Sequence, residues 1–366
     1  FNQVDIFNNG FLADFNRARS NLLLTGHASC TSPGCQALTV FPHLAAGGLL
    51  TNGTVIGQLI GGTPADLAII YYSNGLAGSV PFVANRSTGT ADFLTNSATY
   101  YYNSFQAEVR HQFSGGLLFQ ANYTFSKDLT NAGGTGQTRF DPFLDNGATN
   151  LDYTRADFDQ TQVFNANFIY ELPFGNGKRF LNHAGLLDRV VGGFELTSIF
   201  RLSTGNPVTI VDPRGTLNRA GRAARQTPDT TLSDGQVQNL IGIFNTPQGL
   251  FFINPSVVDP KTGRASDGFG TTFPGEVFFN AAPGLTGDMP RAVFNGPRFF
   301  EWDASIIKNI RIRETKSLQL RVEAFNALNR ANFLVGLAQN VNSSTFGKIT
   351  SDVAPRTIQL VGKFQF

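Results

Sequence analysis

The chain has 366 residues, of which only 15% are charged, and its formal net charge is +2. This near-neutral balance argues against a general nucleic-acid binder, which requires a concentrated basic surface. The 35 Phe residues, against a single Trp and a single Met, suit β-strands and a lipid-facing surface. No run approaches the roughly 18 apolar residues that a transmembrane helix requires.

The first segment, residues 1–99, is predicted to be a loop region. Cys30 and Cys35 lie within it, separated by Thr-Ser-Pro-Gly, a spacer that favours a turn. A disulfide that closes this short loop outside the cytoplasm is the favoured interpretation. A reduced pair or a metal site is the alternative, although zinc would require two more soft ligands and only His27 is nearby.

Seven later segments alternate between apolar and polar side chains, which is typical of extended strands. Each has 11–16 residues, enough at ~3.3 Å per residue to cross a membrane of roughly 25 Å when tilted. Strands of soluble proteins usually have about five or six residues, so strand length favours a membrane protein. The seven predicted strands are 100–113, 115–127, 158–173, 194–209, 299–311, 317–329 and 356–366.

In a membrane barrel the apolar face of each strand contacts lipid and the polar face lines the lumen. We therefore predict an all-β fold, an antiparallel transmembrane β-barrel fragment. Seven strands are fewer than the ~8 of the smallest bacterial barrels and would leave two bare edges in lipid, so the expected barrel is larger. The predicted lipid face includes Phe119, Ala121, Tyr123, Phe164, Phe168, Phe200, Ile306, Leu320 and Leu360. The polar residues predicted to face the lumen include Glu108, Arg110, Gln120, Asn122, Asn165, Asn167, Arg201, Arg321, Glu323 and Gln359.

The connections between the strands differ in length, with short turns at one rim and the long loops 128–157, 210–298 and 330–355 at the other. This asymmetry is typical of outer-membrane barrels and predicts extracellular long loops and a periplasmic C-terminus. One loop carries a basic run that could meet anionic lipopolysaccharide or an acidic ligand, the alternative being an ordinary solvated loop. The arginines of this run are Arg214, Arg219, Arg222 and Arg225.

The sequence offers no recognisable catalytic motif, and we expect neither an enzyme nor a cofactor. The four histidines lack metal-ligand spacing, and no G-x-S-x-G nucleophile elbow is present. Loop carboxylates form one cluster that is a candidate for calcium binding or, alternatively, a set of solvated turn residues. The cluster consists of Asp141, Asp145, Asp152, Asp157 and Asp159.

Several segments in order resemble the C-terminal barrel of TonB-dependent outer-membrane receptors, closest to the Oar-like subgroup with a carboxypeptidase-regulatory-like N-terminal domain. They include YYNSFQAEVRHQFSGGLLFQANYTFSKDL, DFDQTQVFNANFIYELPFGNGKRF, GGFELTSIFRLSTGNPV and TIQLVGKFQF. The resemblance implies a barrel of about 22 strands plugged by an N-terminal domain, with energy relayed by the TonB complex. It also implies that Phe364 and Phe366 belong to the terminal signal read by the barrel assembly machinery. The plug and the TonB box lie outside this sequence, and we interpret the chain as part of a longer protein.

Three functions are therefore compared. The first is the wall of an importer in the bacterial outer membrane, with membrane lipid, the TonB complex, the assembly machinery and an unidentified bulky ligand as partners. The second is a passive or structural barrel, such as an adhesin or pore, without TonB coupling. The third is a secreted β-sandwich binding module, which is disfavoured because its apolar strand faces would lie exposed in water.

Overall fold

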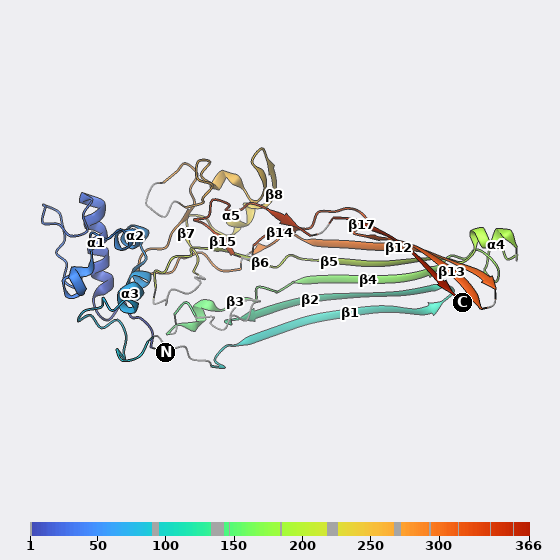
Figure 1. The fold of residues 1–366 in the computed structure, drawn as a ribbon, viewed down its shortest axis with the longest axis horizontal. Coiled ribbons are helices and arrows are strands. Elements are labelled where there is room, and N and C mark those ends of the chain that lie inside the picture. Colours follow the sequence, from blue (N-terminus) through green and yellow to red (C-terminus); the bar gives the residue numbers. More distant parts are fainter. Residues whose placement is uncertain are drawn as a thin grey trace.

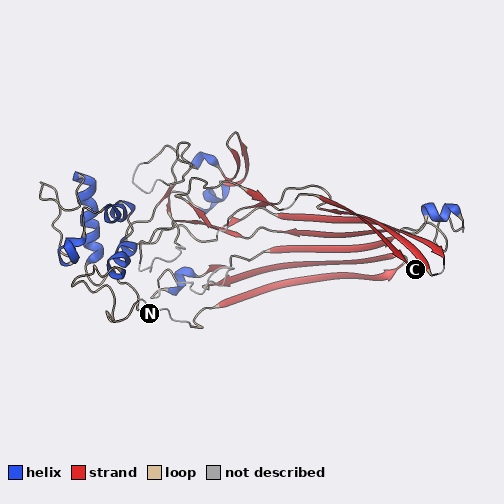
Figure 2. Cartoon of the chain, in the orientation of Figure 1, coloured by secondary structure: helices blue, strands red, loops and turns tan. Residues whose placement is uncertain are grey.

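The dominant feature of the molecule is a long sheet with a cap of helices and loops at one end and one short helix at the other (Figures 1 and 2). In the described part of the chain, no helix has both the length and the apolar character needed to cross a membrane. The computed structural model describes residues 2–89, 95–132, 143–145, 147–183, 185–217, 226–266, 272–292, 294–313, 315–336, 338–353 and 355–366.

Seven long antiparallel strands form the main sheet, and each pairs with the next long strand along the chain. The predicted all-β antiparallel fold is confirmed. Among the described residues, the two outer strands, β1 and β17, have no further strand beside them, so the sheet is open rather than closed into a barrel. In sheet order the strands are β1 (Tyr100–Ser114), β2 (Leu117–Thr130), β4 (Gln162–Glu171), β5 (Phe194–Ser203), β12 (Phe299–Arg313), β13 (Lys316–Phe325) and β17 (Thr357–Gln365).

The register separates the two faces of this sheet. Phe119 lies directly opposite Phe168, while the next residue, Gln120, lies opposite Asn167. Since residues directly opposite each other project to the same face, the predicted apolar side chains share one face and the predicted polar side chains share the other.

The apolar face is less exposed than the sequence predicted. Of the nine residues of the predicted lipid face, which we expect to be exposed where lipid is absent, Ile306, Leu320 and Leu360 are 50%, 45% and 76% exposed, and the other six are half-buried. Neighbouring rings shield one another, as the centroids of Phe200 and Phe300 are 5.0 Å apart. None of the nine is buried in a protein core.

The predicted strand 194–209 is two strands in the structure. Strand β5 ends at Ser203, and a separate strand β6 (Pro207–Val211) pairs with β11 (Phe294–Asn295) and, in parallel, with β15 (Ala338–Asn340). A Cβ on Gly205 would lie 2.3 Å from the carbonyl oxygen of Gly296, so only glycine fits where the chain leaves the main sheet. Pro207, which lacks an N–H, begins the new strand.

The two long loops after β5 and β13 fold into a packed unit, which we call the loop unit. Its core contains Val208, Ile210, Ile253, Phe278, Phe294 and Phe346, which are almost fully buried. Its remaining elements are β7 (Asp229–Thr230), α5 (Asp234–Asn239), β8 (Ile241–Thr246), β9 (Gly249–Ile253), η4 (Pro255–Val257), β10 (Phe278–Phe279), β14 (Phe333–Leu334) and β16 (Ser351–Asp352). The shorter loop before β4 holds η3 (Thr149–Asp152) and β3 (Thr154–Arg155), which pairs with β2.

Residues 2–89 contain helices, whereas the sequence pattern predicted a loop region here. We call residues 2–89 the helical unit. Its buried rings Phe11, Phe41, Tyr71 and Phe82 pack together, with the centroids of Phe11 and Phe82 4.9 Å apart. The unit lies at the long-loop end of the sheet (Figure 1). Its elements are α1 (Phe11–Thr25), η1 (Phe41–His43), η2 (Ala45–Gly48), α2 (Gly53–Gly61) and α3 (Pro64–Ser73).

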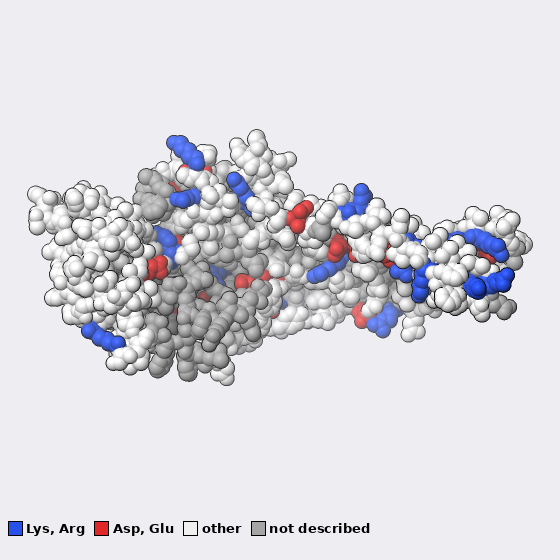
Figure 3. Space-filling view, in the orientation of Figure 1, with Lys and Arg blue, Asp and Glu red and all other residues white. Residues whose placement is uncertain are grey.

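The opposite end of the sheet carries the short turns and helix α4 (Leu186–Val191), which lies in the connection between β4 and β5. Lys and Arg side chains gather at this end of the molecule (Figure 3). The structure therefore has a large folded cap at one rim and a compact basic rim at the other.

Candidate functional site

The polar face of the main sheet is the first candidate site, and its side chains bond to one another across the strands. Asn165 donates to the side-chain oxygen of Asn122 at 3.1 Å, and the hydroxyls of Thr197 and Ser305 are 2.6 Å apart. Short polar side chains in such ladders satisfy one another and leave a hydrophilic wall.

Four of the predicted charged groups on this face form two ion pairs, each within a single strand. Arg110 contacts Glu108 at 2.8 Å, and Arg321 contacts Glu323 at 3.0 Å. Residues two apart in a strand project to the same face, which is why these pairs form. Both pairs are solvent-accessible, so each contributes at most ~1 kcal/mol to stability. Each of these two pairs is therefore locally neutral.

Three further predicted lumen residues, Asn165, Asn167 and Arg201, lie on the central strands β4 and β5. Asn165 is opposite Arg201, and Asn167 is opposite Ile199. The guanidinium of Arg201 lies 5.2 Å from the ring centroid of Phe299 on the adjacent strand, and Arg201 is directly opposite Glu301 of that strand. Among the arginines predicted to face the lumen, Arg110 and Arg321 are ion-paired within their own strands, whereas Arg201 is not paired in this way among the described residues.

Buried arginine–aspartate pairs hold together the cap of helices and loops. The sequence pattern did not predict these pairs. Arg214 is ion-paired with the fully buried Asp212 at 2.8 Å, and it donates to the carbonyl oxygens of Gly61 and Ala281 at 2.6 Å each. Arg214 thereby joins the loop unit to the helical unit. The sequence placed this arginine in a solvated basic run, but its side chain is only 12% exposed, so it does not offer a free charge to an anionic ligand. Arg219, Arg222 and Arg225 lie outside the described residues.

Three carboxylates of the candidate calcium cluster are engaged in other contacts. Asp152 pairs with Arg291 at 2.6 Å, and Asp159 pairs with Arg155 at 2.8 Å. Asp145 accepts a bond from the backbone N–H of Gly147. Within the described ranges no three His, Cys, Asp or Glu side chains come close enough to hold a metal ion, and Asp141 lies outside those ranges.

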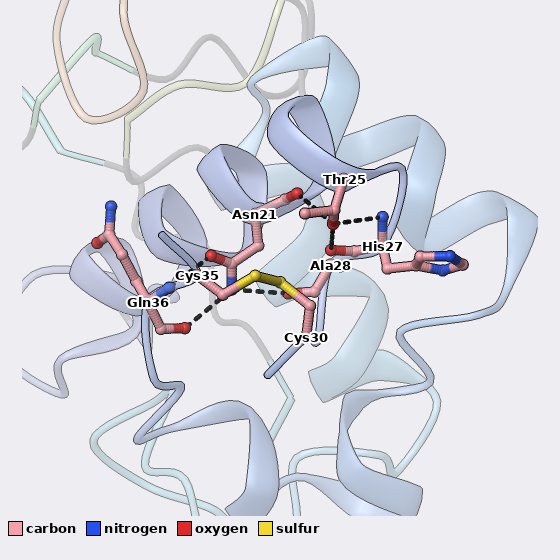
Figure 4. Close-up of a disulfide and its surroundings, with 7 residues drawn as sticks. All are labelled: Asn21, Thr25, His27, Ala28, Cys30, Cys35 and Gln36. Carbon is pink, nitrogen blue, oxygen red and sulfur yellow. Dashed lines mark hydrogen bonds between the residues drawn. A yellow bond between two sulfur atoms is a disulfide. The ribbon is translucent and has the colours of Figure 1, made fainter. Parts of the chain in front are cut away.

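The disulfide lies on the helical unit, where Cys30 and Cys35 are bonded with their Cα atoms 5.9 Å apart (Figure 4). Asn21 braces the same loop, because its side chain donates to the carbonyl oxygens of Ala28 and Gln36 and accepts from the N–H of Gln36. The bond and the asparagine fix one loop conformation at the edge of the cap.

One recess in the cap lies between residues 144–154 and 286–291, with a volume of about 260 Å³. Ligand pockets usually measure ~300–1,000 Å³, so this recess is too small to enclose a bulky substrate. At the other end of the chain, Phe364 and Phe366 are 51% and 92% exposed, and their rings lie 6.2 Å apart. The terminal aromatic residues are accessible on the edge strand.

The comparison with family models decides the class of protein. A family described as an outer membrane beta barrel domain matches residues 58–359, most of the chain. The chain belongs to this family. No curated protein and no solved structure matches it.

Membership in the outer membrane beta barrel domain family explains the two faces of the sheet. The barrel domain resides in the outer membrane, where lipid covers an apolar face that water would otherwise contact. The matched range begins within α2 and ends within β17, so it includes the long sheet, the loop unit and part of the helical unit.

Proposed function

We propose that this chain is the C-terminal wall of a TonB-dependent receptor that imports a bulky substrate across the outer membrane. The observation that carries the proposal is an open sheet of seven membrane-length strands with a polar face. A membrane barrel has to close because unpaired strand edges are costly in lipid. Strands in addition to these seven would complete a barrel wide enough to hold a folded plug.

The polar wall supports transport rather than catalysis. Its paired charges and its amide and hydroxyl ladders suit a hydrated passage. We place the cap outside the cell, where it would select the substrate, and the C-terminus in the periplasm. Short turns on the periplasmic side and long outer loops are typical of such barrels, and a disulfide on the cap fits an oxidising compartment.

The proposed partners follow from the same arrangement. Outer-membrane lipid would cover the apolar face, and the barrel assembly machinery would recognise the terminal strand with Phe364 and Phe366. The TonB complex would act on a segment of the native protein outside this sequence.

Binding of TonB tests the proposal. The native full-length protein is purified in detergent, and its affinity for the periplasmic domain of TonB is measured by titration. Saturable binding, together with the absence of a steady current in a planar bilayer, is expected for a plugged importer. A native protein that leaves TonB unbound and conducts a steady current would instead be a passive pore.

A further inference from the structure

Helix α4 presents an apolar face that nothing in the described chain covers. Leu186, Leu187 and Val190 are 79%, 71% and 70% exposed. Their spacing places Val190 one turn from both leucines, on the same side of the helix. Such exposure is unusual for large aliphatic side chains in a cluster and marks a surface that meets another apolar phase.

Lys308 shows on which side of the sheet this helix lies. It belongs to the apolar face of β12, since it lies opposite Phe194 and Leu320. Its Nζ donates to the carbonyl oxygens of Val190, at 3.1 Å, and Gly192 at the end of α4, and it lies 4.4 Å from the ring centroid of Phe194. The end of α4 is thus fixed on the lipid-facing side of the rim.

Beside the apolar face lies an open, basic recess of about 480 Å³. Arg189 from α4 and the strand-end residues Arg311 and Arg313 line it, together with Leu186 and Asp188. Asp188 is engaged, because one of its carboxylate oxygens accepts from the backbone N–H of Asn176 at 2.6 Å. Three arginines against one aspartate leave the recess positive.

We propose that α4 and this recess form a binding site for an anionic phospholipid of the membrane leaflet at the short-turn rim. Leu187 and Val190 enter the acyl region, while Arg189, Arg311 and Arg313 hold the headgroup phosphate. An apolar surface bordered by arginines matches the boundary between acyl chains and phosphates, and guanidinium groups bind phosphate through paired N–H donors. That this leaflet is the periplasmic one depends on the orientation given under the proposed function. The lipid-binding site itself does not depend on that orientation.

Lipid-specific fluorescence quenching tests this site. Leu187→Cys in the full-length protein is labelled with an environment-sensitive fluorophore under non-reducing conditions, and the protein is reconstituted in phosphatidylcholine vesicles. Doxyl-labelled phosphatidylglycerol or doxyl-labelled phosphatidylcholine is then titrated in. We expect quenching by both lipids, with a several-fold preference for phosphatidylglycerol.

Variants test whether the arginines of the recess cause the preference for phosphatidylglycerol. The triple variant Arg189→Gln/Arg311→Gln/Arg313→Gln is expected to lose it and to keep quenching by both lipids. The control variant Arg86→Gln/Lys261→Gln/Arg356→Gln removes the same charge from the cap and is expected to retain it. Absence of quenching, equal quenching by both lipids in the parent protein, or a preference that survives the triple substitution would overturn the site. A positive result in a protein that does not bind TonB would leave the site intact and refute only the import proposal.

Discussion

The indole Nε1–H of Trp302 donates a hydrogen bond of 2.7 Å to the hydroxyl of Ser198 on the neighbouring strand. Both side chains lie on the apolar face, because Trp302 is opposite Phe200 and Ser198 is opposite Phe168. An unpaired polar group is costly in lipid. The bond allows one serine and the single tryptophan of the chain to lie on a lipid-facing surface, with Ser198 only 6% exposed.

This pair should be energetically coupled. Ser198→Ala leaves the indole N–H without its partner, and Trp302→Phe leaves the hydroxyl without its donor. We expect the double variant to be destabilised by less than the sum of the two single variants, with a coupling of about 0.5–1.5 kcal/mol. The free energy of unfolding is measured in lipid vesicles from the fraction of the fast-migrating folded band against urea concentration. Strictly additive effects would show that the hydrogen bond contributes nothing.

Two neighbouring residues of β4 test the assignment of the faces. Phe168 faces the lipid side and Asn167 the polar side. A charge at mid-membrane on the lipid face costs ~2–4 kcal/mol, so Phe168→Arg should reduce the amount of folded protein in the outer membrane. Asn167→Arg, next to Gln120, should assemble normally. Heat-modifiable migration of membrane fractions measures both, and equal assembly of the two variants would contradict the lipid-face assignment.

The sheet could be predicted from the sequence because the pattern that specifies each strand lies within that strand's own residues. Alternation with a period of two fixes the face of each side chain without knowledge of its partners, and strand length distinguishes membrane from soluble strands. The pairs Glu108–Arg110 and Arg321–Glu323 follow from the same rule, since each joins residues two apart.

The cap could not be predicted in this way. In α1 the buried face contains Asp14 and Asn21, so polar residues interrupt the helical pattern. In α3 apolar residues surround the helix and give no clear period. The bond from Arg214 to the carbonyl oxygen of Gly61 joins residues separated by 153 positions, and no local pattern reveals it.

Arg214 should control the attachment of the helical unit. Arg214→Ala leaves Asp212 buried without its partner, which typically costs ~3–5 kcal/mol, and also removes the bonds to Gly61 and Ala281. We expect faster protease cleavage between the helical unit and β1 in the full-length protein, with the membrane strands still folded. Arg86→Ala is the control, because Arg86 is exposed and, among the described residues, its guanidinium donates to the carbonyl oxygen of Ser79. Equal cleavage rates for both variants would show that the ion pair does not hold the unit.

The disulfide should stabilise the helical unit modestly. Closure of so short a loop stabilises a fold by about 2 kcal/mol in the chain-entropy model. Cys30→Ser/Cys35→Ser should therefore lower the thermal midpoint of the helical circular-dichroism signal, and a reductant should have the same effect on the parent protein but none on the variant. Asn21→Ala should add to the loss, since Asn21 holds both sides of the loop. A midpoint unchanged by reduction would contradict the stabilising role.

Asp14 should make the helical unit sensitive to acid. Its fully buried carboxylate accepts backbone hydrogen bonds from Thr39, Val40 and Phe41 at 2.7–2.9 Å. Burial alone would raise the pKa of Asp14, but these donors and Arg17 outweigh it and hold the pKa below its usual 3.8.

The folded state therefore binds fewer protons than the unfolded state between the two pKa values. The stabilisation is present above the unfolded pKa of ~3.9 and is lost as the pH falls through the folded value. Helical circular dichroism should fall in this range before the membrane strands unfold. Asp14→Asn should destabilise the unit at neutral pH by about 1–3 kcal/mol and flatten this pH dependence. The exposed Asp234→Asn is the control, and a parent-like acid transition in Asp14→Asn would assign the sensitivity to another group.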